Sequence, residues 1–309
     1  MKGKALFGII LVMNIVMMIA SAASAQVAIP ALALNDIEQS LYGQVTPLEA
    51  GLLARIERIE KDLFGNPQTG SLISRVDNLK ALATVGTGGS SLIMKLNCAE
   101  WMIFGRMTPG GPLVNRLQQI EREVYGSAQT GPVDTRIAGL VGLVWPSGNL
   151  ETGKVSLPAG TQVRVKLMNE ISSRTAKTGD LIKYVVLQNI TIDSKVIIPA
   201  GAEGVGRVTG VRSAGSFGRD ADVTVDFGTV YALDGTAIRM SSARPGEKPS
   251  TSELAAGASL LGLVALGPAG LLGGVLVRGE ELIVSAGYEI SLTTAEQVSV
   301  VGLSLTPSR

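Results

Sequence analysis

The chain has 309 residues, with 38 glycines, one cysteine, no histidine and a net charge of +1. The lack of histidine excludes Ser-His-Asp and Cys-His catalysis and any His-ligated metal site, and the near-neutral charge argues against a nucleic-acid partner. Because a disulfide needs two thiols, we expect Cys98 to be a buried apolar side chain, a free thiol or half of an intermolecular bridge.

The first 25 residues have the pattern of an export signal. Two lysines precede an apolar run from Ala5 to Ala20, and the small residues Ala23-Ser24-Ala25 form a cleavage site. The apolar run is short for the ~20 residues that a spanning helix needs, but an uncleaved anchor is an alternative. We therefore expect a signal peptide at 1–25 and an exported mature chain with 25 basic and 26 acidic residues.

A short pattern recurs four times in the region 36–143. Each copy reads Glu, two further residues, an aliphatic residue, an aromatic residue and Gly, and the copies are Glu38–Gly43, Glu60–Gly65, Glu100–Gly105 and Glu121–Gly126. An Arg next to an aliphatic residue follows each Gly after 10 to 12 positions, namely Arg55, Arg75, Arg116 and Arg136. Thr-Pro follows the first and third copies, and Gln-Thr-Gly follows the second and fourth. The pattern predicts a duplicated two-helix unit with a small-residue linker at 84–91.

The repeats predict amphipathic helices. One helical face carries aliphatic residues at three- and four-residue steps: Leu53, Ile56, Ile59 and Leu63 in the first copy, and Leu113, Leu117, Ile120 and Val124 in the second. Helices this short need a packing partner in water, so the region either docks another component or serves as a helical spacer or oligomerisation stalk. We expect the four repeated Glu side chains to be exposed caps or ion-pair partners of the repeated Arg residues rather than catalytic acids.

From about residue 155 to residue 305 the periodicity changes to two. Apolar and polar residues alternate along 162–167, 223–227 and 288–292. Turns containing Gly, two of them also Pro, are expected at 157–160, 198–201 and 284–287. Short strands with one solvent-exposed face favour an antiparallel barrel or sandwich. The expected fold class is therefore α+β, with helical repeats followed by a β domain that carries an inserted apolar helical hairpin.

That insert is a stretch of 24 residues without charge, Leu254 to Val277. As one straight helix it would be about 36 Å long, but Gly267-Pro268-Ala269-Gly270 near its middle favours a helical hairpin. Three interpretations stay open: a membrane-inserting hairpin, a hairpin buried against the barrel or a neighbouring subunit, and a flexible apolar loop. The residues expected to contact membrane or a subunit are Leu260, Leu261, Leu263, Val264, Leu266, Leu271, Leu272, Val275 and Leu276.

The β region carries short motifs in a particular order. They are Leu157-Pro158-Ala159-Gly160-Thr161, Ile171-Ser172-Ser173, Val196-Ile197-Ile198-Pro199-Ala200-Gly201, Gly206-Arg207-Val208, Val223 to Phe227, and Asp234-Gly235-Thr236 with Ile238. This order resembles the C-terminal β-barrel of the TrbI-like scaffold proteins of conjugation and type IV secretion machines. The resemblance covers about residues 155–305. It implies a periplasmic barrel that assembles into a ring, with the hairpins contributing to an outer-membrane channel.

The N-terminal half departs from that family, because the duplicated repeat replaces the inner-membrane helix and the proline-rich stretch of its members. The resemblance and the export signal together indicate the periplasm or outer membrane of a bacterium with two membranes.

Asp220, Asp222 and Asp226 lie close together in the sequence, but the alternation of apolar and polar residues along the strand predicts that they point to solvent. The sequence also lacks a phosphate-binding loop, a nucleophile elbow and metal-ligand spacing. We therefore expect neither an enzyme nor a cofactor or metal site.

Two hypotheses of function follow. In the first, the chain forms a homo-oligomeric envelope barrel whose apolar hairpin contacts or enters the outer membrane, with the repeat helices as a periplasmic stalk or docking surface. In the second, the chain is a soluble periplasmic module that holds another envelope component, such as peptidoglycan, an S-layer or a surface protein.

Overall fold

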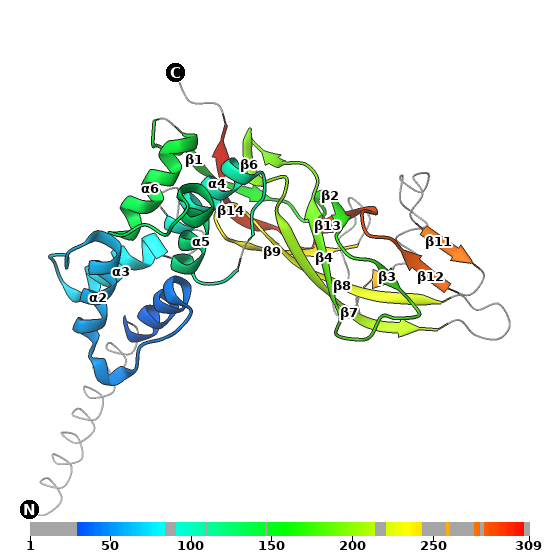
Figure 1. Ribbon diagram of the computed structural model, residues 1–309, viewed down its shortest axis with the longest axis horizontal. Helices are drawn as coiled ribbons and strands as arrows, with labels where there is room; N and C mark the ends of the chain where they lie inside the picture. Colours follow the sequence, from blue (N-terminus) through cyan, green and yellow to red (C-terminus); the bar gives the residue numbers. More distant parts are fainter. Residues whose placement is uncertain are drawn as a thin grey trace, which may run out of the picture. The chain divides into compact units, whose positions relative to one another are not determined.

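The computed structural model describes residues 30–83, 91–108, 110–145, 147–213, 221–242, 258–259, 275–278 and 281–305. The chain divides into two compact units. One unit spans Met1–Thr84 and Gly111–Arg136, and the other spans Val85–Gly110 and Ile137–Arg309. The first unit is helical, and the second carries the β-sheets (Figure 1). The fold is therefore α+β, with helical repeats ahead of a β domain, as the sequence predicts.

Each copy of the duplication contains three α-helices, whereas the repeat predicts two helices in each copy. The first copy consists of a helix at 30–42, the short 3-10 helix η1 (Leu48–Ala50), α2 (Leu52–Phe64) and α3 (Leu72–Ala83). The second consists of α4 (Leu92–Phe104), α5 (Leu113–Tyr125) and α6 (Val133–Val144). The third helix of each copy lacks the Glu pattern and was therefore missed, although it carries the repeated Arg.

The repeated glycines end the helices. Gly43, Gly65, Gly105 and Gly126 all have a positive φ, between 64° and 85°. In each case the Gly N–H donates to the carbonyl four residues earlier, at 2.8–3.0 Å. A residue without a Cβ adopts this left-handed conformation at little cost. The final Gly of the pattern is therefore the stop signal of each helix.

Six strands of the second unit form a closed antiparallel barrel. They are β2 (Gln162–Leu167), β4 (Leu181–Val186), β7 (Glu203–Arg212), β8 (Asp222–Tyr231), β9 (Ala237–Ser241) and β13 (Glu289–Thr294). The order is β8-β7-β4-β2-β13-β9, and pairing of β9 with β8 closes the cylinder. The apolar positions of these strands alternate into one core, as the sequence pattern predicts. A closed barrel removes free sheet edges.

Two smaller sheets accompany the barrel. The first has the order β1 (Thr152–Leu157), β14 (Val298–Ser304), β6 (Lys195–Ile198) and β5 (Ile190–Ile192). The second has the order β11 (Val275–Arg278), β12 (Glu281–Val284) and β3 (Ile171–Ser172). The tight turns expected ahead of or between strands are present, because Gly160, Gly201 and Gly287 have φ values of 78°, 83° and 88°.

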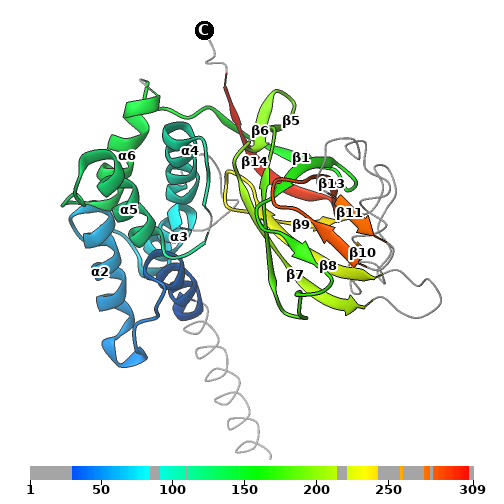
Figure 2. The ribbon, with the colours of Figure 1, turned by 45° about the vertical axis from the view of Figure 1, so that its right-hand side comes forward.

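The longest strands, β7 and β8, run side by side as a hairpin (Figures 1 and 2). Their register shifts twice along the pair, which marks irregular, bulged pairing.

Gly204 provides room for Tyr184, because a Cβ at this position would overlap the ring. The Tyr184 hydroxyl donates to the carbonyl of Phe227 at 2.8 Å. The two rings also meet edge to face, with centroids 6.2 Å apart.

The helix α4 belongs to the compact unit that contains the barrel, although its sequence belongs to the repeat. Met94 and Cys98 join the core of the barrel, and Asn97 Nδ2 donates to the carbonyl of Leu233 at 2.9 Å. After the helix, Met107 forms a parallel bridge with Ala202. The first helix of the second copy is thus part of the β unit. Burial raises the pKa of the Cys98 thiol to about 12, and the thiol is free.

Most of the apolar insert lies outside the described residues. Its two described pieces are strands, which contradicts the helical hairpin there. The strand β10 (Ala258–Ser259) pairs with β8 opposite Val225 and Thr224, and β11 pairs with β12. The hairpin was predicted from the uncharged length of the insert and the Gly-Pro-Ala-Gly sequence near its middle, and neither feature identifies the strands with which short apolar segments pair.

Candidate functional site

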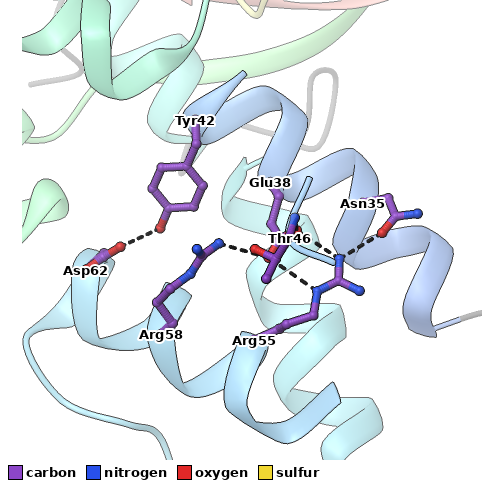
Figure 3. A network of polar contacts seen from close by, with 7 residues as sticks. All are labelled: Asn35, Glu38, Tyr42, Thr46, Arg55, Arg58 and Asp62. Atoms are coloured by element: carbon purple, nitrogen blue, oxygen red, sulfur yellow. Dashed lines mark hydrogen bonds and ion pairs between the residues drawn. The ribbon is translucent and has the colours of Figure 1, made fainter. Parts of the chain in front are cut away.

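Glu38 lies at the centre of a polar network between the helix 30–42 and α2 (Figure 3). Its Oε2 accepts hydrogen bonds from Arg55 Nη2 at 2.8 Å and from the backbone N–H of Thr46 at 2.7 Å. Its Oε1 accepts from Arg55 Nε at 3.3 Å and from Arg58 Nη2 at 3.0 Å. The carboxylate is fully buried, and these donors replace the water that it loses on folding.

Other side chains extend this network toward the surface. Arg55 Nη2 also donates to Asn35 Oδ1 at 2.7 Å, and the Tyr42 hydroxyl donates to Asp62 Oδ2 at 2.8 Å. The guanidinium carbon of Arg58 lies 5.1 Å from the centroid of the Tyr42 ring, within the range of a cation–π contact. The aromatic residue of the repeat pattern is therefore tied to the following helix as well.

Glu60 repeats the arrangement between α2 and α3. Its Oε1 accepts from Arg75 Nε at 2.9 Å, and its Oε2 accepts from Arg75 Nη2 at 2.6 Å. The backbone N–H of Gln68 donates to the same Oε2 at 2.8 Å. The guanidinium and the carboxylate thus form a two-point contact, which is the strongest geometry for this pair.

The second copy of the duplication uses the same contacts. Glu121 accepts from Arg136 Nε at 2.8 Å, from Arg136 Nη2 at 2.7 Å and from the N–H of Gln129 at 2.9 Å. Glu100 accepts from the N–H of Thr108 at 3.2 Å. In all four copies the amide belongs to the residue eight positions after the Glu. We call the unit of Glu carboxylate, loop amide and Arg guanidinium the Glu–Arg clasp.

The clasps of Glu38 and Glu60 favour the charged form of the carboxylate. Burial alone would raise the pKa of Glu38, but the hydrogen bonds from Arg55 and from Thr46 outweigh it, so the pKa lies below its ordinary value. The pKa of Glu60 is lowered in the same way, by Arg75 and by the amide of Gln68 against the effect of burial. The hydrogen bond to Glu60 raises the pKa of Arg75.

The predicted ion pairing of the repeated Glu and Arg residues is confirmed for Glu38, Glu60 and Glu121. The expectation that these Glu side chains are exposed is wrong, because all three are at most 1% exposed. Their oxygens are engaged by Arg and by loop amides, so the clasp serves to join consecutive helices. Proton transfer to a substrate is not a role that this geometry favours.

The first unit contains two pockets among its described residues. One pocket, of about 370 Å³, lies between the end of α2 and α3 and is lined by Glu60, Phe64, Gln68, Thr69, Arg75, Asn78, Leu79, Ala81 and Leu82. The other, of about 450 Å³, is lined by Tyr42, Lys61, Asp62, Gly65, Val114, Gly131, Pro132, Val133 and Arg136. The aromatic residue of a repeat copy lines each of them. Sequence reasoning identified neither pocket.

The residues expected to pack the repeats are mostly interior. Ile56, Ile59, Leu63, Leu113, Leu117 and Ile120 are 0–4% exposed. Leu53 departs from the expectation because it is 48% exposed, and Val124 is half-buried. Leu53 lies in the first turn of α2.

The residues expected to contact membrane or a subunit lie in the apolar insert. Leu260, Leu261, Leu263, Val264, Leu266, Leu271 and Leu272 are outside the described residues. Val275 and Leu276 belong to β11 and pair with Val284 and Ile283 of β12. The expected role of these residues stays a prediction.

The acidic residues of β8 do not form a common solvent-facing group. Asp222 is buried, contrary to the expectation that it points to solvent. Asp226 pairs with Arg239 at 2.8 Å and accepts from the N–H of Gly228 at 2.9 Å. Asp220 lies outside the described residues. Within the ranges that the structure describes, no acidic or thiol cluster could hold a metal ion.

In the described part of the chain, no helix is both long enough and apolar enough to cross a bilayer.

No family model and no curated protein matches the chain. Among solved structures, ComB10 of the Com type IV secretion system of Helicobacter pylori is similar to it. That match has 12% sequence identity and a TM-score of 0.28, and it covers 47% of this chain and 90% of that chain. Membership of the TrbI-like family therefore stays a prediction from the motif order of the β region.

Proposed function

We propose that the chain is a non-enzymatic structural or assembly protein of the cell envelope, which forms a homo-oligomer through its β unit and places its apolar insert against the outer membrane. The repeat helices then serve as a periplasmic stalk or docking surface. The proposal needs no cofactor, metal or nucleic acid.

The observation that carries this proposal is that both described segments of the apolar insert pair with strands of the β unit. One end, β10, pairs with a strand of the closed barrel, and the other, β11, pairs with β12. A 24-residue stretch without charge is thus attached to folded β-structure on both sides. Such a stretch in water would be an aggregation site, which favours its burial in lipid or between subunits.

The helical unit supports a mechanical role rather than a chemical one. Consecutive helices are joined by buried, charge-assisted contacts that fix the loop between them. Short helices are unstable alone in water, and the clasps hold them as one body. A rigid series of helices suits a spacer or a docking surface.

Fractionation of cells that express the full chain tests the proposal. The mature protein should require detergent for release from the envelope fraction. A variant that lacks Leu254 to Val277 should be released without detergent and should run as a monomer. A full-length mature chain that is released by osmotic shock as a monomer would overturn the proposal and favour the soluble docking module.

A further inference from the structure

The pocket beside α3 has the chemistry of a small-molecule site. Its volume of about 370 Å³ falls within the ~300–1,000 Å³ of such sites. The lining combines the half-buried Phe64 with Leu79 and Leu82, and it also includes the polar residues Gln68, Thr69 and Asn78. Apolar walls with a few polar groups that set orientation are the usual composition of a ligand site.

The lining of the pocket carries no net charge. Glu60 and Arg75 belong to it, and they neutralise each other in the clasp at 2.6 Å. The remaining polar lining residues, Gln68, Thr69 and Asn78, are neutral amides and a hydroxyl. A charged ligand would lose its hydration without gaining a counter-charge. The pocket therefore favours an uncharged ligand that both donates and accepts hydrogen bonds.

Two features restrict this ligand further. The ring of Phe64 can pack against the apolar face of a ligand ring, whereas the side-chain amides of Gln68 and Asn78 can pair with hydroxyl or acetamido groups. The side-chain amide of Gln68 is oriented by its own hydrogen bond, from Nε2 to the carbonyl of Asn66 at 2.9 Å. An amphipathic ring with polar substituents is the chemistry of a sugar.

The same loop occurs in the second copy. Gln129 Nε2 donates to the carbonyl of Ser127 at 3.0 Å, as Gln68 does to Asn66. Tyr125 stands at the position of Phe64 and is 44% exposed. Repetition of an aromatic residue and a Gln-Thr pair along one chain matches a ligand that is itself a repeating polymer.

We propose that the pocket formed by Phe64, Gln68, Thr69, Asn78 and Leu82 binds an uncharged amino-sugar unit of a glycan chain. The proposal deepens the docking role of the helical unit, and it depends neither on oligomerisation nor on the apolar insert. A peptide is the less favoured occupant, because the pocket is lined by residues of two helices, α2 and α3, and of the loop between them, which offer no strand edge to an extended chain.

Titration of the isotope-labelled mature chain with chitotriose, a neutral trimer of N-acetylglucosamine, tests the proposal by NMR. The backbone amides of Gln68, Thr69 and Asn78 should shift in a saturable way. Asn78→Ala should weaken binding about tenfold, as expected for loss of about 1.4 kcal/mol of hydrogen bonding. Ala81→Trp, which adds a large side chain to the lining of the pocket, should abolish the shifts.

The exposed neighbour Asp77 supplies the matched control, because it lies on the same helix but does not line the pocket. Asp77→Ala should bind like the unmodified chain. Absence of saturable shifts, or shifts that survive both Asn78→Ala and Ala81→Trp, would overturn the proposal. Binding of an unrelated peptide in this pocket without chitotriose binding would overturn it as well. Deletion of Leu254 to Val277 should leave the shifts unchanged. The titration and the fractionation therefore test the two proposals independently.

Discussion

Glu60 shows how much one buried side chain contributes to this protein. Its carboxylate is 1% exposed and is held by Arg75 and by the amide of Gln68. The net contribution of a buried ion pair over an apolar pair is small, but removal of one partner leaves the other charge unpaired. The clasp is therefore far more sensitive to a single substitution than to replacement of the whole pair.

Glu60→Gln should destabilise the helical unit by about 3–5 kcal/mol, because the buried guanidinium of Arg75 loses its counter-charge. Denaturant unfolding followed by far-ultraviolet circular dichroism measures the loss. Asp77→Asn, at an exposed position on α3, should change the stability by less than about 0.5 kcal/mol. Equal effects of the two substitutions would contradict the structural role of the clasp.

The clasps also predict a direction of pH dependence. The folded-state pKa values of Glu38 and Glu60 lie below the ordinary value of 4.5. Their stabilisation is therefore complete above the unfolded pKa and is lost as the pH falls through the folded pKa. Unfolding of the helical unit, measured between neutral pH and about pH 3, should show a stability that falls with acid. In Glu38→Gln/Glu60→Gln the remaining slope should be distinctly shallower.

At the residue scale the sequence predicted the partners of the repeated Glu but not their burial. The recurrence of an Arg 15 to 17 positions after each Glu is visible in the sequence, whereas the burial of the Glu side chain depends on which helix covers it. A signal was available, because Glu38, Glu60 and Glu121 each follow an isoleucine of the apolar stripe. A charged residue that adjoins the buried face in three of the four copies is a candidate for a buried pair.

At the scale of elements, the barrel depends on glycines at the β7–β8 pair. A Cβ at Gly204 would overlap the ring of Tyr184, whereas a Cβ at Gly210 meets nothing closer than 3.7 Å. Gly204→Ala should therefore destabilise the barrel by about 1–3 kcal/mol, and Gly210→Ala should be nearly neutral. Tryptophan fluorescence measures the difference, since Trp101 and Trp145 both belong to the unit with the barrel.

The helix α4 provides a second test at this scale. Met94 is fully buried in the barrel core, whereas Met102 on the same helix is half-buried. Met94→Ala should reduce the stability of the β unit by about 2–5 kcal/mol through the cavity that it leaves. Met102→Ala should cost less, and the tryptophan transition should report both. If Met94→Ala leaves that transition unchanged, α4 is not part of the barrel core.

At the scale of elements, the sequence predicted the strands correctly where apolar and polar residues alternate without interruption over several residues. The alternating strands and their Gly turns are present, whereas the boundary of the β unit was not visible. The helix α4 carries the repeat pattern, but its only charged residues are Lys95 and Glu100. A helix that is apolar on most sides is normally buried, and that composition was the signal that α4 differs from α2 and α5.

At the scale of the whole molecule, the chain combines a clasped helical unit with a β unit in which the closed barrel pairs with one described end of the apolar insert and a smaller sheet pairs with the other. The sequence predicted this composition and the order of its parts. The path of the insert could not be predicted, because a Gly-Ala-Leu stretch is compatible with a helix, a strand or a loop until a partner fixes it. The central question about function is therefore whether the insert contacts lipid, another subunit or water.

Native mass spectrometry of the mature chain in detergent answers that question most directly. The unmodified chain should appear as one defined oligomer, and the chain without Leu254 to Val277 should appear as a monomer that needs no detergent. A monomer for both forms, with the unmodified chain equally well behaved in plain buffer, would contradict the assembly role.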